Sequence, residues 1–295
     1  MSKVIYLIQG QAKHLKKFFP LTQRADIDVL FLTYDEKIDE AIYFPNSTWG
    51  EGRNHLLEQA LASQKEYQYY IFLDDDVIFK KGDFTEFEAQ LARHNPAVAV
   101  PVFSPKTEFT ILGLGLSSCS RWFMPIKDYQ ICKYADAQFI AFHRDVVENR
   151  LVVPLQTRFD TLSWGGTSST QQLLIFNLYN DTTLQFNTVI VTNEAHRDYP
   201  RGKGKFKQAQ QMWLCAQLRH APDDPRNYAI NLLSVKGLIR AARRSKKMPS
   251  LRYLSEFGKI LLGTLSYKRK ERHLMSEEDM LTLLQPDSDL LKHVP

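Results

Sequence analysis

Short runs of apolar and β-branched residues alternate, along the first two thirds of the chain, with segments whose apolar residues recur at helical spacing. This alternation predicts a doubly wound α/β fold, in which a mixed, mostly parallel sheet is flanked by helices. The predicted strands and buried apolar runs cover 4–8, 28–33, 41–44, 69–73, 97–103, 122–126, 135–142 and 184–192, and the predicted helices cover 14–19, 54–63, 83–94, 143–149, 171–179 and 206–219.

Three local signals set predicted boundaries. Pro20 is expected to end the first helix, and residues 159–168 have the composition of a turn-rich loop. Ser168 or Ser169 is expected to cap the helix at 171–179. Beyond Pro222 the pattern predicts helices only.

The stretch from Tyr69 to Phe79 combines an apolar strand with three consecutive carboxylates, Asp74, Asp75 and Asp76. In open α/β sheets, ligands bind outside the carboxyl ends of the strands. Adjacent carboxylates repel one another unless water or a cation compensates them, and Mg²⁺ or Mn²⁺ shared with substrate phosphates is a common solution. In an extended chain Asp74 and Asp76 point the same way, so these two can reach one cation. An exposed acidic turn that merely ends a strand is the alternative.

Composition changes this picture little. The chain has 295 residues, of which 44% are hydrophobic and 24% charged, as in ordinary globular proteins. This length suits one large α/β domain, or a domain at 1–222 with an extension at 223–295; the resemblance described below implies that 1–222 is catalytic and divides into halves at 1–103 and 104–222. No apolar run approaches the roughly 20 residues that span a bilayer, and the amino terminus does not match a signal peptide. The three cysteines are widely spaced and favour a reducing cytoplasm.

Gly52-Arg53-Asn54, an apolar helix, and then a strand that ends in Asp74-Asp75-Asp76 resemble the nucleotide-sugar half of GT-A glycosyltransferases, in particular those like family 2, with their Asp-x-Asp motif. The resemblance covers roughly residues 1–205 and implies a Rossmann-like GT-A fold. It implies that Asp76 coordinates a metal, Mn²⁺ or Mg²⁺, which bridges two phosphates, and that Asp74 contacts this metal or the ribose.

The same resemblance assigns further residues to the donor site. Asp35 follows the second strand and matches an acidic residue that binds a uracil ring. His196 matches a late histidine that completes the metal site, and neutral histidine suits Mn²⁺ better than Mg²⁺. The remaining nucleotide-sugar contacts implied are Arg53, Asn54, Asp75, Arg201 and Lys203, the last two of which neutralise the leaving pyrophosphate. Each has a plainer alternative as a helix-surface, capping or loop residue.

The acceptor half departs from the family pattern. Many GT-A enzymes place an acidic base after a Trp-Gly-Gly-like loop, but here Trp164-Gly165-Gly166 is followed by Thr and Ser. Asp160 is the nearest carboxylate and the predicted catalytic base, with Asp136 and Asp198 in reserve. A retaining enzyme needs no base at this place, so the stereochemical outcome stays open. Trp164 and Gly165 are the predicted acceptor contacts, although a tryptophan packed in the core is the usual alternative.

Charge is concentrated near the carboxyl terminus. Residues 236–272 carry 12 Lys and Arg against two Glu, a local charge of +10, whereas the whole chain carries +5. Cationic helices with an apolar face bind anionic membrane surfaces, which predicts peripheral attachment at the inner face of the membrane. The alternative, that these helices pack on the catalytic domain and expose a solvated basic face, stays open. No nucleic acid partner is expected, because no recognition motif is present.

The combined prediction is a metal-dependent glycosyltransferase. It would move a sugar from a nucleoside-diphosphate sugar, with UDP favoured, to a glycan or lipid-linked acceptor in surface polysaccharide or glycoconjugate synthesis. A haloacid-dehalogenase-like phosphatase or phosphotransferase also uses Asp-x-Asp after a strand, but usually after the first strand of its domain. A non-catalytic scaffold with the same fold would explain the missing base. Both of these functions stay open beside the transferase.

Overall fold

A computed structural model describes residues 4–103, 110–111, 114–115, 127–132, 135–150, 152–155, 157, 160, 164–179 and 182–193 of the 295-residue chain. The predicted strand at 122–126, the predicted helix at 206–219 and the whole extension at 223–295 lie outside these residues. Among the predicted site residues, His196, Arg201 and Lys203 also lie outside them.

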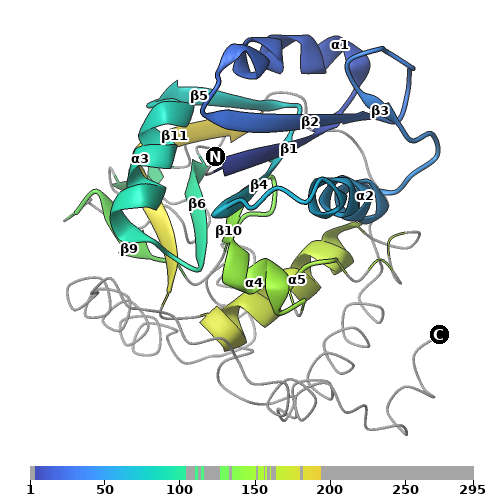
Figure 1. The fold of residues 1–295 in the computed structure, drawn as a ribbon. Coiled ribbons are helices and arrows are strands. Elements are labelled where there is room, and N and C mark those ends of the chain that lie inside the picture. The colour runs from blue at the N-terminus through green and yellow to red at the C-terminus, as the bar shows by residue number, and fades with distance from the viewer. Residues whose placement is uncertain are drawn as a thin grey trace, which may run out of the picture.

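The described residues form a mixed sheet of nine strands (Figure 1). Its parallel half comprises β3 (Ile42–Tyr43), β2 (Ile27–Thr33), β1 (Val4–Gly10) and β4 (Tyr69–Asp74), in that order. Next comes β10 (Phe139–His143), antiparallel to both β4 and β6 (Val98–Phe103). β11 (Thr183–Asn193) then runs parallel to β6 and carries two antiparallel neighbours, β5 (Val77–Lys81) and β9 (Tyr129–Ile131). A separate hairpin pairs β7 (Thr110–Ile111) with β8 (Leu114–Gly115).

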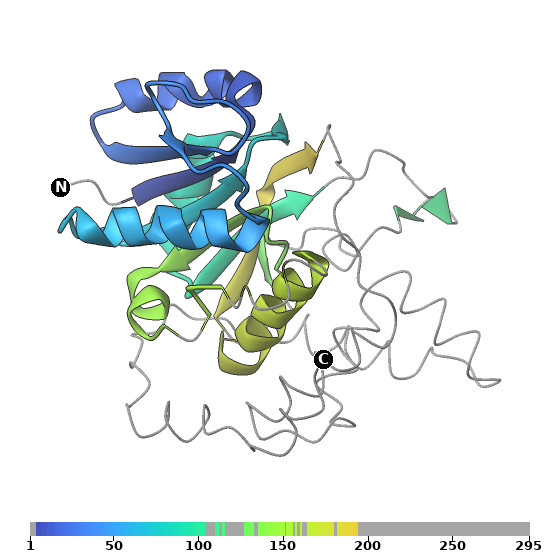
Figure 2. The same cartoon turned by 90° about the vertical axis from the view of Figure 1, so that its right-hand side faces the viewer.

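Helices cover both faces of this sheet (Figures 1 and 2). One face carries α1 (Ala12–Leu15), the 3₁₀ helix η1 (Lys16–Gln23) and α3 (Phe84–His94), and the other carries α2 (Trp49–Ala62), α4 (Arg144–Glu148) and α5 (Trp164–Tyr179). Every residue of β1 is buried, as expected for a strand covered on both faces. Its side chains alternate between two cores: Tyr6 and Ile8 belong to the first, and Ile5 and Leu7 to the second.

Two predicted helix starts were wrong, for local reasons. α2 begins at Trp49 rather than Asn54, because Thr48 and Glu51 form a capping box in which each side chain bonds the other's backbone amide. α5 begins at Trp164, so the predicted loop ends earlier and Ser168 and Ser169 lie inside the helix rather than at its cap.

Three further features differ from the predicted pattern. Pro20 does not end the first helical segment but lies inside η1. β5 was not predicted, and it follows the acidic triplet directly because Asp75 and Asp76 form a turn between β4 and β5. The predicted strand at 135–142 begins four residues later, at Phe139.

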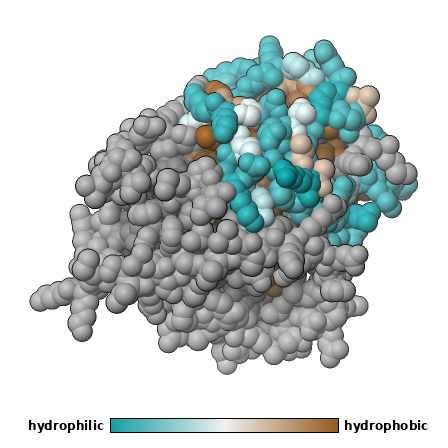
Figure 3. All heavy atoms as spheres, turned by 90° about the vertical axis from the view of Figure 1, so that its left-hand side faces the viewer, coloured by the Kyte–Doolittle hydropathy of each residue, from teal (hydrophilic) through white to brown (hydrophobic). Residues whose placement is uncertain are grey.

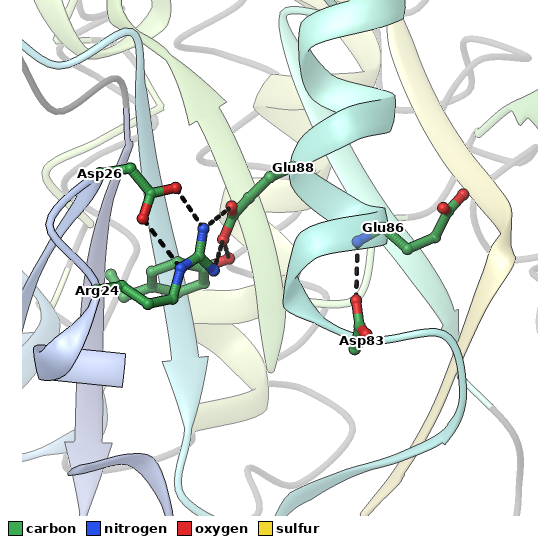
Figure 4. A network of polar contacts seen from close by, with 6 residues as sticks. Arg24, Asp26, Asp83, Glu86 and Glu88 are labelled. Atoms are coloured by element: carbon green, nitrogen blue, oxygen red, sulfur yellow. Dashed lines mark hydrogen bonds and ion pairs between the residues drawn. The ribbon is translucent and has the colours of Figure 1, made fainter. Parts of the chain in front are cut away.

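A closed polar network ties α3 to the sheet (Figure 4). Arg24 donates through Nε and Nη2 to Asp26, and through Nη1 and Nη2 to the carboxylate of Glu88. The buried Tyr6 hydroxyl donates to Glu88 Oε1 at 2.7 Å. We call Tyr6, Arg24, Asp26 and Glu88 the Arg24 network.

On the face of the molecule that Figure 3 shows, the surface of the described residues is mainly hydrophilic. Among the residues that the structure describes, only Tyr43 and Leu61 are large, apolar and exposed. Within the same residues, no helix combines the length and the apolar character that crossing a membrane requires.

Candidate active site

The acidic triplet lies where the parallel strands end. In the register of the sheet, Gln9 of β1 is paired with Asp74 of β4, and Gly10 with Thr33 of β2. The carboxyl ends of three neighbouring strands therefore meet at one edge, which is the usual ligand edge of an open α/β sheet.

Asp74 ends β4 with its side chain against the beginning of α2. Its Oδ1 atom accepts hydrogen bonds from Arg53 Nη2 at 2.6 Å and from Trp49 Nε1 at 3.2 Å. The Arg53 guanidinium also lies 4.4 Å from the centre of the Trp49 ring, a cation–π contact. No described residue donates to Asp74 Oδ2. One carboxylate oxygen is thus fixed to α2, and the other is left to accept a ligand.

Arg53 combines deep burial with missing partners. The residue is 1% exposed, yet among the described residues its Nε and Nη1 atoms have no hydrogen-bond partner. Buried donors are nearly always paired, so an unpaired guanidinium edge beside a strand end is the signature of a group that meets a ligand or another segment.

Asp75 points to the opposite face of the sheet. It is 3% exposed, and its Oδ2 accepts a hydrogen bond from the Gln11 amide at 2.8 Å and lies 3.1 Å from His14 Nδ1. A Cβ atom on Gly10 would clash with Asp75 Cβ, so glycine is required where this side chain packs. Burial, the largest cause, raises the pKa of Asp75 to about 7. Asp75 therefore contacts α1 rather than the edge that Asp74 faces.

Asp76 is the least satisfied of the three carboxylates. Burial first, and then the charges of Asp74 and Asp75, raise its pKa to about 7. Its Oδ1 atom is buried without a hydrogen-bond partner among the described residues, while the nearby Asn193 side chain lowers the pKa of Asp76 and so opposes part of this shift. Asn193 is paired with Val77 across β11 and β5, so the end of β11 lies beside the triplet.

Asp35 lies at the same edge, after β2. Its side chain is exposed, and Oδ1 accepts hydrogen bonds from the amides of Ala12 and Glu36, both at 3.0 Å. It thus caps the start of α1, next to the Gln11 amide that binds Asp75. The predicted contact of Asp35 with a uracil ring stays a prediction.

Asn54 and Asp160 are placed differently from what the sequence suggested. The Asn54 side chain bonds the backbone of Leu155 twice, donating to its carbonyl at 2.9 Å and accepting from its amide at 2.6 Å. Asp160 is 1% exposed and accepts hydrogen bonds from Thr48 Oγ1, the Gly50 amide and Thr167 Oγ1. Neither contact set includes the triplet. Both side chains instead join α2 to the following half of the chain.

The remaining predicted acceptor residues, Trp164 and Gly165, form the first turn of α5, and only their backbone is described. Sequence reasoning missed Trp49, although the capping signal Thr48-x-x-Glu51 places a helix start there and so sets Trp49 in its first turn. It also missed His14, for which the sequence offers no signal, because its contact with Asp75 depends on the fold.

No protein-family profile matches the chain, and no curated protein resembles it significantly in sequence. Solved structures do resemble it. S. aureus TarS 1–349 in complex with UDP-GlcNAc has a TM-score of 0.50 at 10% identity, with 100% of this chain and 82% of the TarS 1–349 chain covered. GalNAc-T7 with UDP, GalNAc and Mn²⁺ has a TM-score of 0.51 at 10% identity, with 100% of this chain and 58% of GalNAc-T7 covered. This likeness confirms the predicted fold class, the α/β fold of GT-A glycosyltransferases.

Proposed function

We propose that the chain is a metal-dependent glycosyltransferase that takes a sugar from a nucleoside diphosphate, UDP being favoured, and transfers it to a glycan or lipid-linked acceptor. The observation that carries the proposal is a set of buried polar atoms without partners, among the described residues, at the carboxyl edge of a GT-A-type sheet. These atoms are Arg53 Nε, Arg53 Nη1 and Asp76 Oδ1, beside Asp74.

The carboxylates fit a divalent cation. Within the described part of the chain, Asp76 Oδ1 is a buried hard oxygen without a partner. Asp74 Oδ2 is a second hard oxygen, on a side chain that is 18% exposed, and it receives no hydrogen bond from the described residues. Oxygen ligands of this kind suit Mg²⁺ and Mn²⁺. Among the described residues no group of three His, Cys, Asp or Glu could hold a metal, so a further ligand must come from elsewhere in the chain or from the substrate.

His196 remains the proposed third ligand. It follows Asn193 by three residues, and Asn193 is paired with Val77, the residue after Asp76. Three residues of extended chain span about 10 Å, which is enough to bring a side chain back to a neighbouring carboxylate. Arg201 and Lys203 remain proposed contacts of the diphosphate.

The chain's own residues would prepare the donor site. A bound cation supplies positive charge against the diphosphate that leaves when the sugar is transferred. Arg53 and Trp49 fix one oxygen of Asp74, so that the other keeps a constant position. Such fixed, partly dry surroundings strengthen each charge interaction with the leaving group. Transfer itself forms a bond from the acceptor oxygen to the anomeric carbon, breaks the bond to the diphosphate, and requires a group that takes the hydroxyl proton.

The contacts of Asp160 do not suit a catalytic base. Both oxygens of Asp160 accept hydrogen bonds in a site that is 1% exposed, which does not suit a group that must touch an acceptor hydroxyl. Asp136 is partly buried and lies two residues from Gln138, whose carbonyl accepts a hydrogen bond from the Asp74 amide. We therefore rank Asp136 above Asp160 as the candidate base, with Asp198 outside the described residues.

Ligand-dependent stability tests the donor site directly. Thermal unfolding is followed with UDP and Mn²⁺ together, with each alone, and with ADP or GDP and Mn²⁺. A ligand at 100 times its Kd raises the free energy of unfolding by about 2.7 kcal/mol. We expect stabilisation by UDP only with the cation. No effect of any nucleotide with Mn²⁺ would favour a non-catalytic scaffold.

Product analysis separates a phosphatase from a glycosyltransferase. A phosphatase of the haloacid dehalogenase kind releases phosphate from simple phosphate esters, whereas a glycosyltransferase cleaves UDP-sugars. No described contact favours the phosphatase, since Asp74 follows three strands of the sheet and is paired with Arg53. We therefore expect cleavage of UDP-sugars and no release of phosphate from simple esters.

Membrane attachment through residues 236–272, and with it a lipid-linked acceptor, is proposed from the sequence alone. The local charge of +10 is the observation behind it. Sedimentation with anionic and with neutral liposomes, at low and at high salt, tests this attachment. Binding to anionic liposomes that salt abolishes is the expected result, and equal binding to both lipid types would contradict it.

A further inference from the structure

The first turn of α2 is held by a carboxylate from a distant part of the chain. Thr48, the helix cap, donates its hydroxyl to Asp160 Oδ2 at 2.5 Å, and the Gly50 amide donates to the same oxygen at 2.9 Å. The positive end of the helix dipole makes this a favourable place for a carboxylate. Asp160 thus completes the start of α2 from 110 residues away along the chain.

The other oxygen of Asp160 reaches a second helix. Oδ1 accepts a hydrogen bond from the hydroxyl of Thr167, which lies in the first turn of α5. A single buried side chain therefore joins the starts of α2 and α5, which belong to the two halves predicted from the sequence.

Two further features show that α2 packs closely against the second half of the chain. A Cβ atom on Gly50 would lie 2.5 Å from Asp160 Oδ2, so glycine is needed for the carboxylate to approach the helix. One turn further along α2, Asn54 makes its two hydrogen bonds with the backbone of Leu155. α2 is thus tied to the second half of the chain at two successive turns.

The first turn of α2 contains Trp49, the residue that contacts Asp74. Trp49 lies between Thr48 and Gly50, and its Nε1 donates to Asp74 Oδ1. Arg53, one turn later, donates to the same oxygen and packs on the Trp49 ring. A continuous path of contacts therefore runs from α5 through Asp160 and the first turn of α2 to Asp74.

We propose that Asp160 is a positioning residue. By holding the first turn of α2 against α5, it fixes the position in which Asp74 binds the nucleotide sugar. This inference rests on the proposed function for its effect on donor binding, but not for the path of contacts itself. Catalytic groups must be held within about 0.5 Å of their productive positions by side chains that are themselves locked. Without Asp160, three donors lose their acceptor, of which the Gly50 amide and the Thr167 hydroxyl are buried, and the turn that carries Trp49 loses its anchor.

Binding of UDP with Mn²⁺ provides the first test, on full-length protein at a temperature where every variant is folded. We expect Asp160→Asn and Thr167→Val to weaken this binding by about 10-fold or more, as substitutions behind metal ligands commonly do. Thr167→Ser keeps the hydroxyl and should restore wild-type affinity. Tyr6→Phe, in the Arg24 network, controls for a general loss of stability and should bind as the wild type does.

A second readout does not depend on UDP. The chain has four tryptophans, so fluorine NMR of fluorotryptophan-labelled protein gives few signals, and Trp49→Phe identifies the signal of Trp49. We expect this signal to move in Asp160→Asn and Thr167→Val and to stay in Thr167→Ser and Tyr6→Phe. If Asp160→Asn does not fold, the two Thr167 variants carry the test.

The possible outcomes separate the two hypotheses. A wild-type protein that does not bind UDP with Mn²⁺ defeats the proposed function, and the Trp49 signal then decides the positioning role alone. An unmoved Trp49 signal in Asp160→Asn and Thr167→Val overturns the positioning role. So does unchanged UDP affinity in Asp160→Asn together with a large loss of turnover, because that result is expected of a catalytic base.

Discussion

The acidic triplet and the Arg24 network are two clusters of charged side chains on the same sheet, and they differ in how completely their polar atoms are paired. Three nitrogens of Arg24 donate to two carboxylates (Figure 4). The Tyr6 hydroxyl also donates to Glu88. Among the described residues, Arg53 makes one hydrogen bond, to Asp74, although it is more deeply buried than Arg24.

The difference in pairing indicates that the Arg24 network stabilises the fold and that the acidic triplet binds a ligand. A network whose polar atoms are paired, and which is partly open to water as at Asp26 (67% exposed), adds to stability or costs little, and needs no ligand. Unpaired buried atoms cost free energy, and a fold keeps them where a ligand offsets that cost in binding or catalysis. The position of the triplet at the carboxyl edge of the sheet fits ligand binding, whereas the Arg24 network lies between β1 and α3.

The largest effect is expected from Asp76→Asn. Removing this carboxylate should weaken the binding of UDP with Mn²⁺ by about 100-fold or more, since even substitutions behind metal ligands cost roughly 10- to 100-fold. The free energy of unfolding without ligand should stay equal or rise, because a buried, mutually repelled charge is removed. Calorimetric titration and chemical unfolding measure the two effects. Wild-type affinity in this variant would end the assignment of Asp76 as a ligand.

The opposite behaviour is expected in the Arg24 network. Glu88→Ala leaves the buried Tyr6 hydroxyl without its acceptor and should lower the free energy of unfolding by about 2 kcal/mol, with UDP affinity unchanged. Tyr6→Phe, which removes the hydroxyl itself, should cost only about 1 kcal/mol. Chemical unfolding and calorimetric titration measure both quantities. A loss of UDP binding in either variant would remove the distinction between the two clusters.

Arg53→Lys is expected to fall between these cases. Lysine keeps the charge but loses the planar group that bonds Asp74 and packs on Trp49. UDP affinity with Mn²⁺, measured by the same titration, should fall about 10-fold, which corresponds to about 1.4 kcal/mol. Leu61→Ala on the exposed side of the same helix is the matched control. Equal affinity in Arg53→Lys and the wild type would mean that charge alone, not the shape of the guanidinium, holds Asp74.

The sequence predicted the elements better than the contacts. Strands such as Val4–Gly10 are nearly continuous apolar runs buried on both faces, so hydrophobic pattern alone reveals them. The position of the triplet at a strand end was predicted correctly, because an apolar run precedes it. The predicted start of α2 was too late, because it was placed by the spacing of apolar residues. The capping box at Thr48 and Glu51 marks the true start.

The predicted roles of Asn54 and Asp160 show where residue type stops being informative. Both are polar residues beside a motif, and residue type alone suggests chemistry for each. Their partners, Leu155 and Thr48, are 101 and 112 residues away along the chain, so only the fold reveals that both join α2 to the second half. The contact of His14 with Asp75 also depends on the fold, so the sequence does not reveal it.

Asp160 shares features with both clusters: burial raises its pKa, as it does that of Asp76, yet its oxygens accept hydrogen bonds, as those of Glu88 do. Burial, the largest cause, raises its pKa above the ordinary value, and the hydrogen bonds from Thr167, Thr48 and Gly50 act in the opposite direction. Between the unfolded pKa of about 4 and the raised folded pKa, the folded state binds more protons than the unfolded state, so stability falls as pH rises.

This is the smallest of the expected effects, because the donors offset part of the cost of burial. The difference in free energy of unfolding between wild type and Asp160→Asn, measured from about pH 4 to about pH 8, isolates this carboxyl, since all other titrating groups are shared. We expect wild type to lose stability relative to the variant as pH rises above about 4, and the difference to level off above the folded pKa. Thr167→Val removes a donor that lowers the pKa, so in that background the decline should extend to higher pH. A difference that does not change with pH would mean that the three donors cancel the effect of burial, and Asp160 would then belong with the fully paired carboxylates of the Arg24 network.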